Sequence, residues 1–397
     1  MSSEAAPRLL SREFLILGVS TMLFFGAMGA SNPLLPKFVV DVLGGSQTTA
    51  GIVFGSIAVS SLALRSSFGR MGGRRGARRL MLIGCTIGAA GMLVFAAAGN
   101  IAVAVVGRLL LGAGQAAVMT GSTVLAIDLA PAQRRGEAAS YILVAFHLGL
   151  GLGPVVGEAV LAHTSYHGVW FTLAALMAGG AVVGLALPHR PGNPNASKSP
   201  RLHPNGFAPG TVAAFGIVAF VAFSFFIPLY AREIGLDRVG PVFAVASISI
   251  ALVRIVFGRA PDALGPIRSG TIALLLTAAG AVVVAMWHAV PGVYLAAAIL
   301  AGGMALQTPS LIPVAVHRVE VHERASALAT FTMFMDLSVA LTGPLMGLLA
   351  SGAGYRVTFL VSGACALVGL FILRGFLAPR WRAVNEPQLA AAIAASS

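Results

Sequence analysis

The chain repeats a set of arginine, phenylalanine and glycine positions at one fixed spacing. Each copy follows a long apolar run and opens a short basic loop, and the second copy lies 189 positions after the first. The first copy comprises Arg65, Phe68, Gly69, Arg70, Gly76 and Arg79, and the second comprises Arg254, Phe257, Gly258, Arg259, Gly265 and Arg268. An internal repeat on this scale indicates two copies of one folding unit, a build typical of secondary transporters.

The repeated unit is a membrane unit. Hydrophobic residues make up 57% of the chain and charged residues 10%, whereas soluble domains carry roughly a quarter charged residues. Apolar runs of about 20 residues are long enough to cross a hydrocarbon core of roughly 30 Å. Twelve such runs are expected to be helical spans: 14–35, 49–67, 79–98, 100–127, 136–162, 168–188, 209–230, 239–258, 269–290, 292–314, 325–350 and 354–376.

The placement of the charges predicts the orientation of these spans. A net charge of +13 would suit a nucleic-acid-binding protein. However, if the N-terminus is cytoplasmic and the loops alternate, 21 of the 26 Lys and Arg fall in cytoplasmic segments and four fall outside. This is the positive-inside pattern. It predicts a multi-pass protein of the plasma (inner) membrane with both termini in the cytoplasm, and no nucleic-acid partner.

The repeat also divides the chain. Residues 189–208 are rich in Pro, Asn and Ser and have no apolar period, so they are expected to form a cytoplasmic linker. We therefore predict an N-terminal six-helix bundle over 1–188, and a C-terminal bundle with a short cytoplasmic tail over 209–397. The first run is interpreted as a span and not as a signal peptide, because Pro36 and Asp41 at its end have counterparts in Pro228 and Glu233.

Three motifs carry a family resemblance. The segment from Gly69 to Arg79 resembles the Gly-x-x-x-Asp-Arg-x-Gly-Arg-Arg signature of the major facilitator superfamily, except that Gly73 replaces the usual Asp. Arg108 with Gly112 and Gly114 is similar to the family's Arg-x-x-x-Gly-x-Gly signature. The run from Gly149 to Glu158 is similar to the signature of exporters that act as antiporters, with Glu158 in place of its last glycine.

This resemblance covers nearly the whole chain and implies an all-α membrane fold with twelve transmembrane helices in two pseudo-symmetric bundles. It also implies that spans 1, 4, 7 and 10 line a central cavity, that the bundles rock about a site near the midplane, and that the protein is a monomer. No cofactor or metal is expected, since no cluster of His, Cys, Asp or Glu has ligand spacing. The GxGxxA pattern from Gly112 to Ala117 lies inside an apolar span, where a dinucleotide loop cannot form.

The basic loops are candidates for a cytoplasmic gate. Arginines can hold carboxylates and helix C-termini across a closed gate, and glycines allow the helix end to turn tightly. With Gly73 in place of Asp, Asp128 is the expected partner of Arg70 or Arg74, and Glu137 is a second candidate. The alternative is that these arginines only set topology and bind anionic lipid headgroups. The predicted gate residues are Arg65, Gly69, Arg70, Arg74, Asp128, Arg135, Arg254, Arg259 and Asp262.

Proton coupling is predicted for Asp336, His147 and Glu158. Asp336 follows the start of its span by about 12 residues, or about 18 Å, which places it near the midplane. Acids there are functional candidates by default, because an ionised carboxylate in the membrane costs several kcal/mol. His147 lies 189 positions before Asp336 and would make a pseudo-symmetric partner. A structural hydrogen-bonding role is the alternative for both side chains.

The predicted substrate cavity contains Asn32, Arg108, Gln115 and Gln307. Arg108 and Glu158 lie at similar depths, so an ion pair between them is one expectation; without it, Arg108 would favour an anionic substrate or tune a nearby acid. Asn32-Pro33 with Pro36 is expected to break the outer end of span 1.

Small residues in span 5 and its counterpart are expected to pack closely against the other half and to provide a pivot, with simple packing as the alternative. These pivot residues are Gly149, Gly153, Pro154, Gly157, Gly343 and Pro344.

The sequence therefore predicts a secondary active transporter and not an enzyme. Proton-coupled export (antiport) of a small amphiphilic compound or drug by alternating access is the favoured function, with protons, the substrate and the lipid bilayer as partners. A proton-coupled importer or facilitator of a small metabolite is the main alternative, and a non-transporting membrane sensor is a remote one.

Overall fold

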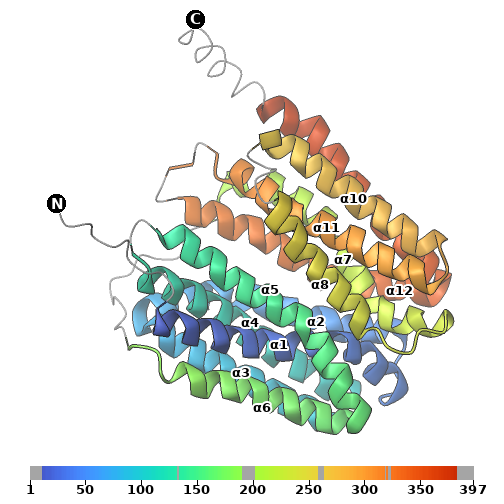
Figure 1. Ribbon diagram of the computed structural model, residues 1–397, viewed down its shortest axis with the longest axis horizontal. Helices are drawn as coiled ribbons and strands as arrows, with labels where there is room; N and C mark the ends of the chain where they lie inside the picture. Colours follow the sequence, from blue (N-terminus) through green and yellow to red (C-terminus); the bar gives the residue numbers. More distant parts are fainter. Residues whose placement is uncertain are drawn as a thin grey trace, which may run out of the picture. The chain divides into compact units, whose positions relative to one another are not determined.

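The computed structural model describes residues 11–131, 134–189, 202–257, 263–317, 319–320 and 323–381, without the side chains of residues 66, 135–137, 139, 140 and 325. Within these ranges the chain is all-helical (Figure 1). It divides into two compact units, one of residues 1–199 with 237–247, the other of residues 200–236 with 248–397. The start of helix α8 thus groups with the first unit, whereas the sequence placed it in the second bundle.

The helices of the first unit follow the predicted spans closely. Each of four of them begins after a Ser or Asn side chain that accepts a hydrogen bond from a backbone N–H of the first turn, as at Ser46 and Asn100. The unit contains α1 (Arg12–Asp41), α2 (Gln47–Arg75), α3 (Ala77–Ala96), α4 (Ile101–Leu129), α5 (Arg135–His163) and α6 (Tyr166–Gly184).

The second unit repeats this series. It begins at a short 3₁₀ turn, η2 (Pro204–Gly206), and ends at a π-helical turn, η3 (Leu373–Leu377). Between them lie α7 (Phe207–Glu233), α8 (Gly240–Phe257), α10 (Pro266–Met286), α11 (Val290–Ala315) and α12 (Arg324–Ile372). Helix α12 contains two spans, because Gly354 adopts a φ of 79° and ψ of 171° inside it. Counting them separately, the 11 long apolar helices of the described chain make the twelve predicted spans.

The repeat is visible in the backbone itself. Gly76 precedes α3 with a φ of 89°, and Gly265 precedes α10 with a φ of 79°. The turns after α1 and α7 likewise use Gly44 and Gly235, at φ 65° and 72°. Glycine adopts this region without the steric penalty of other residues, so these glycines keep the same turn at equivalent points of both units.

Two predicted breaks are helical instead. The segment from Gly69 to Arg75 was expected to form a basic loop, but it continues α2 to Arg75, and only Gly76 turns the chain. Arginine is a good helix former and is favoured near a helix C-terminus, so it extends α2 through the glycines. Helix α1 also runs unbroken past Pro33 and Pro36 to Asp41, because packing against neighbouring helices tolerates proline in a membrane helix.

The glycines of α5 pack within their own unit. A Cβ on Gly149 would lie 2.8 Å from Gly26 N, and one on Gly157 would lie 2.9 Å from Ala30 O, both on the α1 backbone. These glycines therefore face α1 and not the other half, contrary to that part of the prediction, and their role as a pivot stays a prediction. Small residues four apart allow two backbones to approach closely, which is how helices associate in lipid.

This packing predicts a large effect for Gly153→Ala. The added Cβ would lie 2.5 Å from Ala30 N, and backbone cannot move aside as a flexible side chain could. We expect a loss of about 1–3 kcal/mol of stability, measured as a lower melting temperature of the purified protein.

Gly18→Ala is the matched control on α1. Nothing lies within 4 Å of its added Cβ, and alanine is the better helix former by about 1 kcal/mol. Its melting temperature should be unchanged or higher. Equal effects of the two substitutions would contradict the close packing of α1 and α5.

Candidate transport site

A buried arginine joins α4 to α1 in the first unit. Arg108 is 1% exposed, and its Nη1 donates to Ser31 Oγ at 3.2 Å while its Nη2 lies 3.5 Å from Asn32 Oδ1. Its guanidinium carbon lies 5.5 Å from the centre of the Phe54 ring on α2. All these partners are neutral, so a full positive charge is held inside the unit by hydrogen bonds and a cation–π contact.

The local sequence explains this placement. Gly112, one turn after Arg108, lies against α2, where a Cβ would come within 2.8 Å of the Ile57 carbonyl carbon. Ser31 donates its own proton to Met28 O at 2.7 Å, which leaves its oxygen free to accept from Arg108. Gln115, half-buried two turns after Arg108 on the same face of α4, makes no hydrogen bond with a described residue.

Glu158 contacts the start of α8 in this structure, and its part in proton coupling stays a prediction. Its Oε1 accepts from Val239 N at 2.9 Å and its Oε2 from Gly240 N at 2.7 Å, at the start of α8. Glu158 therefore caps a helix N-terminus, where a carboxylate satisfies unpaired N–H groups and the helix dipole. The expected ion pair with Arg108 is not formed in this structure, since the described contacts of Arg108 are all with neutral groups.

Removing this cap should weaken the attachment of α8. Glu158→Ala leaves two backbone donors without their acceptors, so we expect a loss of about 1–2 kcal/mol. Glu158→Gln keeps an acceptor oxygen but loses the charge, so its melting temperature should lie between those of Glu158→Ala and the natural protein. Thermal unfolding of the purified variants measures this order.

Glu233→Ala is the control, because Glu233 is exposed and accepts no hydrogen bond from a described residue. A melting temperature of Glu158→Ala equal to that of the control would mean that the cap does not stabilise the unit.

Asp336 lies in the first span of α12 and is its only acid. The face of α12 that packs on α7 carries Phe334, which touches Gly210, and Ser338, whose Oγ donates to Ala214 O at 2.6 Å. At 100° per residue, Asp336 points well away from that face, and it is half-buried. The carboxylate is thus placed near mid-span by a helix whose other side is fixed to α7.

Gln307 is less available to a substrate than the sequence predicted. It is 3% exposed, and its Nε2 donates to Ala213 O at 2.8 Å, joining α11 to α7. Its amide also lies against Gly216, where there is no side chain to displace it. In this structure Gln307 is a packing residue of the second unit.

His147 and Asp336 belong to different units, so their coupling stays a prediction. His147 is half-buried on α5, with Nδ1 at 2.6 Å from Leu143 O one turn earlier. Its ring lies 4.8 Å from that of Phe146 in an edge-on arrangement.

The predicted gate is only partly described. Arg70 is exposed and donates to Ser67 on its own helix at 3.0 Å, and Arg74 is exposed without a contact to a described side chain. Asp128 is exposed at the end of α4, and its expected pairing with either arginine stays a prediction. Arg65 and Gly69 lie half-buried in α2, and Arg254 lies half-buried in the last turn of α8. The other gate candidates fall on residues or side chains outside the described ones: Arg135, Glu137, Arg259 and Asp262.

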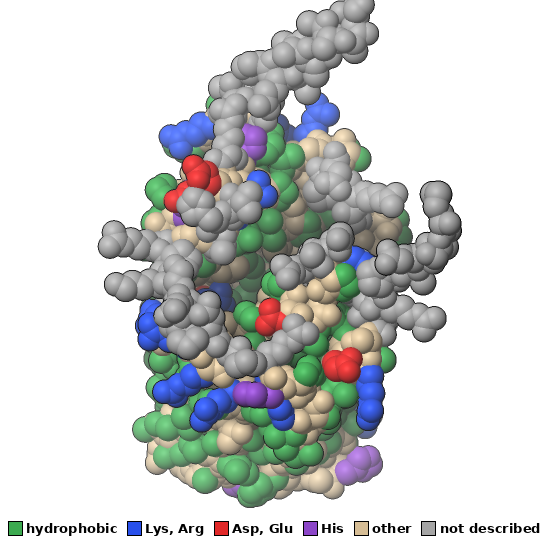
Figure 2. Space-filling model, turned by 90° about the vertical axis from the view of Figure 1, so that its left-hand side faces the viewer, with side chains coloured by type: hydrophobic (Ala, Val, Ile, Leu, Met, Phe, Trp, Pro, Cys, Tyr) green, Lys and Arg blue, Asp and Glu red, His purple; other side chains and the backbone are tan. Residues whose placement is uncertain are grey.

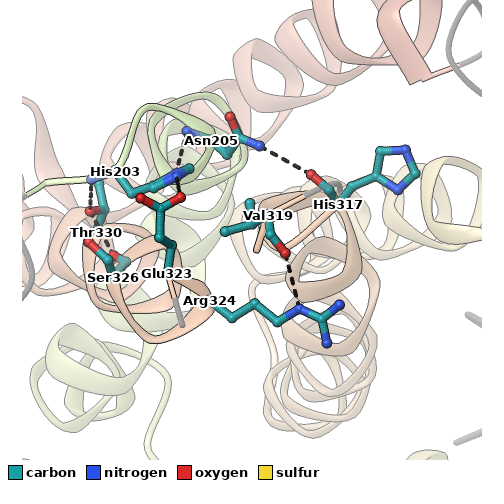
Figure 3. A network of polar contacts seen from close by, with 8 residues as sticks. All are labelled: His203, Asn205, His317, Val319, Glu323, Arg324, Ser326 and Thr330. Carbon is teal, nitrogen blue, oxygen red and sulfur yellow. Dashed lines mark hydrogen bonds and ion pairs between the residues drawn. The ribbon is translucent and has the colours of Figure 1, made fainter. Parts of the chain in front are cut away.

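A polar cluster that the sequence did not predict fastens the start of the second unit (Figure 3). His203 donates its N–H to Thr330 Oγ1 at 2.9 Å and pairs its Nε2 with Glu323 Oε2 at 3.4 Å. Asn205 donates to His317 O at 3.1 Å. The end of the linker is thereby held on the first turns of α12 and on the segment that precedes it. The linker contributes only its final residues to this cluster, and a composition rich in Pro and Asn does not indicate such contacts.

Comparison with known proteins decides the family. The model of the Major Facilitator Superfamily matches residues 17–282 and 238–395. This chain belongs to that superfamily. An uncharacterised MFS-type transporter of Salmonella typhimurium is 30% identical over 91% of this chain and 96% of its own. One of Burkholderia mallei is 30% identical over 88% of both chains.

Solved structures share the superfamily fold. The nucleoside transporter NupG is similar with a TM-score of 0.74 and 15% identity over 92% of this chain and 99% of its own. The human organic anion transporter MFSD10 has a TM-score of 0.71 and 17% identity over 93% of this chain and 100% of its own. The chain is therefore a multi-pass membrane transporter of the major facilitator fold and not an enzyme, as the sequence predicted. At these identities the structural likeness shows the fold alone.

Proposed function

We propose that this transporter exports a small amphiphilic compound or drug in exchange for protons. The observation that carries the proposal is Asp336, a single half-buried acid near the middle of a span. A carboxylate at that depth is far more stable when neutral. Taking up a proton from outside would therefore shift the balance between outward- and inward-open states, and losing it inside would reset the cycle.

Two further features support export of a weakly polar compound. The α5 run from Gly149 to Glu158 resembles the signature of antiporting exporters. Charged groups inside the spans are few, so an apolar or weakly charged substrate fits best. Arg108 favours a second candidate, a substrate with a negative group, because its contacts with the described residues are all with neutral groups. Inward, proton-coupled uptake of a small metabolite is the alternative direction.

The proposed location is the plasma (inner) membrane, with both termini in the cytoplasm and the protein acting as a monomer. The bacterial relatives support the inner membrane, and the distribution of basic residues supports the cytoplasmic placement of the termini. On the face drawn in Figure 2, lysine and arginine side chains clearly outnumber acidic ones.

Proton flux in everted membrane vesicles tests the proposal. Vesicles that hold the protein are energised acid-inside and challenged with lipophilic drugs and small metabolites, some of them anionic. Release of protons on adding a compound, absent from vesicles without the protein, would establish antiport and name a substrate class. No proton release, together with accumulation of a metabolite by intact cells that express the protein, would replace export by import.

A further inference from the structure

A cavity opens in the second unit where α10 begins and α12 ends. Its volume is about 450 Å³, and among the described residues it is lined by the segment Leu264–Arg268 together with Arg374 and Trp381. Its lining includes neither Arg108 nor Asp336. Gly265 and Arg268 belong to the second copy of the basic repeat, but neither is among the predicted gate residues.

The walls of this cavity are basic. Arg268 lies in the first turn of α10, and Arg374 lies in the π-helical turn η3; both are exposed, and neither pairs with a described acid. The α10 N-terminus adds backbone donors, since its cap residue Gly265 supplies no side-chain acceptor. Trp381 closes one side, with its ring 4.5 Å from that of His317.

The first unit joins the equivalent helix ends directly. There Arg78, in the first turn of α3, donates to the carbonyl of Leu185, the cap residue of α6. At the repeat spacing of 189 positions, Arg78 corresponds to Ile267 and Leu185 to Arg374. Ile267 is turned into the apolar core of the second unit instead. One unit thus joins the two helix ends with its own guanidinium, whereas the other leaves a cavity with arginines around it.

The chemistry of the cavity selects a phosphate ester. Guanidinium groups and free backbone N–H groups both bind phosphate oxygens, and two arginines suit an anion better than a zwitterion. Phe371 and Phe376, beside Arg374, are exposed at 68% and 55%, as expected of side chains that contact acyl chains. Tryptophan is typical of the headgroup level of a membrane.

We propose that this cavity binds the phosphate headgroup of an anionic phospholipid from the leaflet on the basic side of the protein. A lipid held there would bridge the start of α10 and the end of α12, the connection that Arg78 makes in the first unit. The proposal does not depend on the substrate or on the direction of transport.

Native mass spectrometry of the purified full chain in mild detergent tests this proposal. The protein is titrated with phosphatidylglycerol, with phosphatidylcholine of the same chains, and with inorganic phosphate. We expect phosphatidylglycerol to bind in preference to phosphatidylcholine. Arg268→Gln with Arg374→Gln should weaken it at least tenfold, since each basic residue near a membrane contributes about 1 kcal/mol, or about fivefold.

Arg75→Gln with Arg79→Gln is the matched control, because it removes the same charge from exposed positions of the first unit. This pair should leave phosphatidylglycerol binding within about twofold of the natural protein. Equal losses in both double variants would reduce the effect to general surface charge and overturn the proposal. If inorganic phosphate binds as tightly as phosphatidylglycerol, the site binds a soluble anion instead. If phosphatidylglycerol binds no better than phosphatidylcholine, the proposed lipid site does not exist.

Discussion

Asp336→Asn should abolish proton-driven transport while leaving substrate binding intact. The side chains are nearly the same size, but the amide cannot exchange a proton, so the variant should behave as if permanently protonated. We expect proton release in energised vesicles to fall at least about a hundredfold, the lower end of what a proton-transferring side chain typically contributes. Substrate affinity of the purified protein should change less than about twofold, because the substitution keeps the size and shape of the side chain.

The packing of α12 allows this test to separate loss of the acid from loss of helix packing. Phe334 and Ser338 hold the opposite side of the helix on α7, and the substitution leaves both contacts untouched. Asp237→Asn is the matched control, since Asp237 is exposed ahead of α8, outside the helices. Normal proton release in Asp336→Asn would exclude Asp336 from coupling, whereas a loss in both variants would indicate a general effect of removing an acid.

The fold was largely predictable because the membrane requires it. A span must be long, apolar and helical, so hydropathy alone located all twelve, and the repeat placed equivalent turns at Gly76 and Gly265. The ends of helices were harder to predict. Helix α2 runs through a Gly- and Arg-rich segment that was expected to be a loop, because no residue before Gly76 requires a non-helical backbone.

The candidate site was predictable only as residue types at certain depths. Sequence spacing selected Arg108 and Glu158 as unusual charges in spans, but it could not tell that one contacts Ser31 and that the other caps α8. Those contacts depend on helix rotation and on which helices are neighbours, and a period of 3.6 residues does not define either. The glycines of α5 show the same limit, because their spacing predicts a close contact without naming α1 as the partner.

Arg108→Met is expected to stabilise the protein and to stop transport. A buried cation without an acidic partner loses more hydration free energy than hydrogen bonds to neutral groups restore. A well-packed apolar side chain of similar length avoids that loss. The described hydrogen bonds and ring contact of Arg108 are with Ser31, Asn32 and Phe54, all neutral, so we expect the melting temperature to rise by the equivalent of about 1–3 kcal/mol. A residue that lowers stability is retained when it serves function, and transport should therefore fall at least tenfold.

Arg108→Lys separates charge from geometry in this test. Lysine keeps the positive charge but presents a single ammonium in place of the planar fork that reaches Ser31 and Asn32 together. If the charge itself attracts an anionic group of the substrate, Arg108→Lys should retain part of the transport that Arg108→Met abolishes. In Arg108→Lys the Michaelis constant should then rise more than the maximal rate falls. If Arg108 only packs α4 against α1, Met should transport normally and melt at a lower temperature, because the bridge to Ser31 would then have been stabilising.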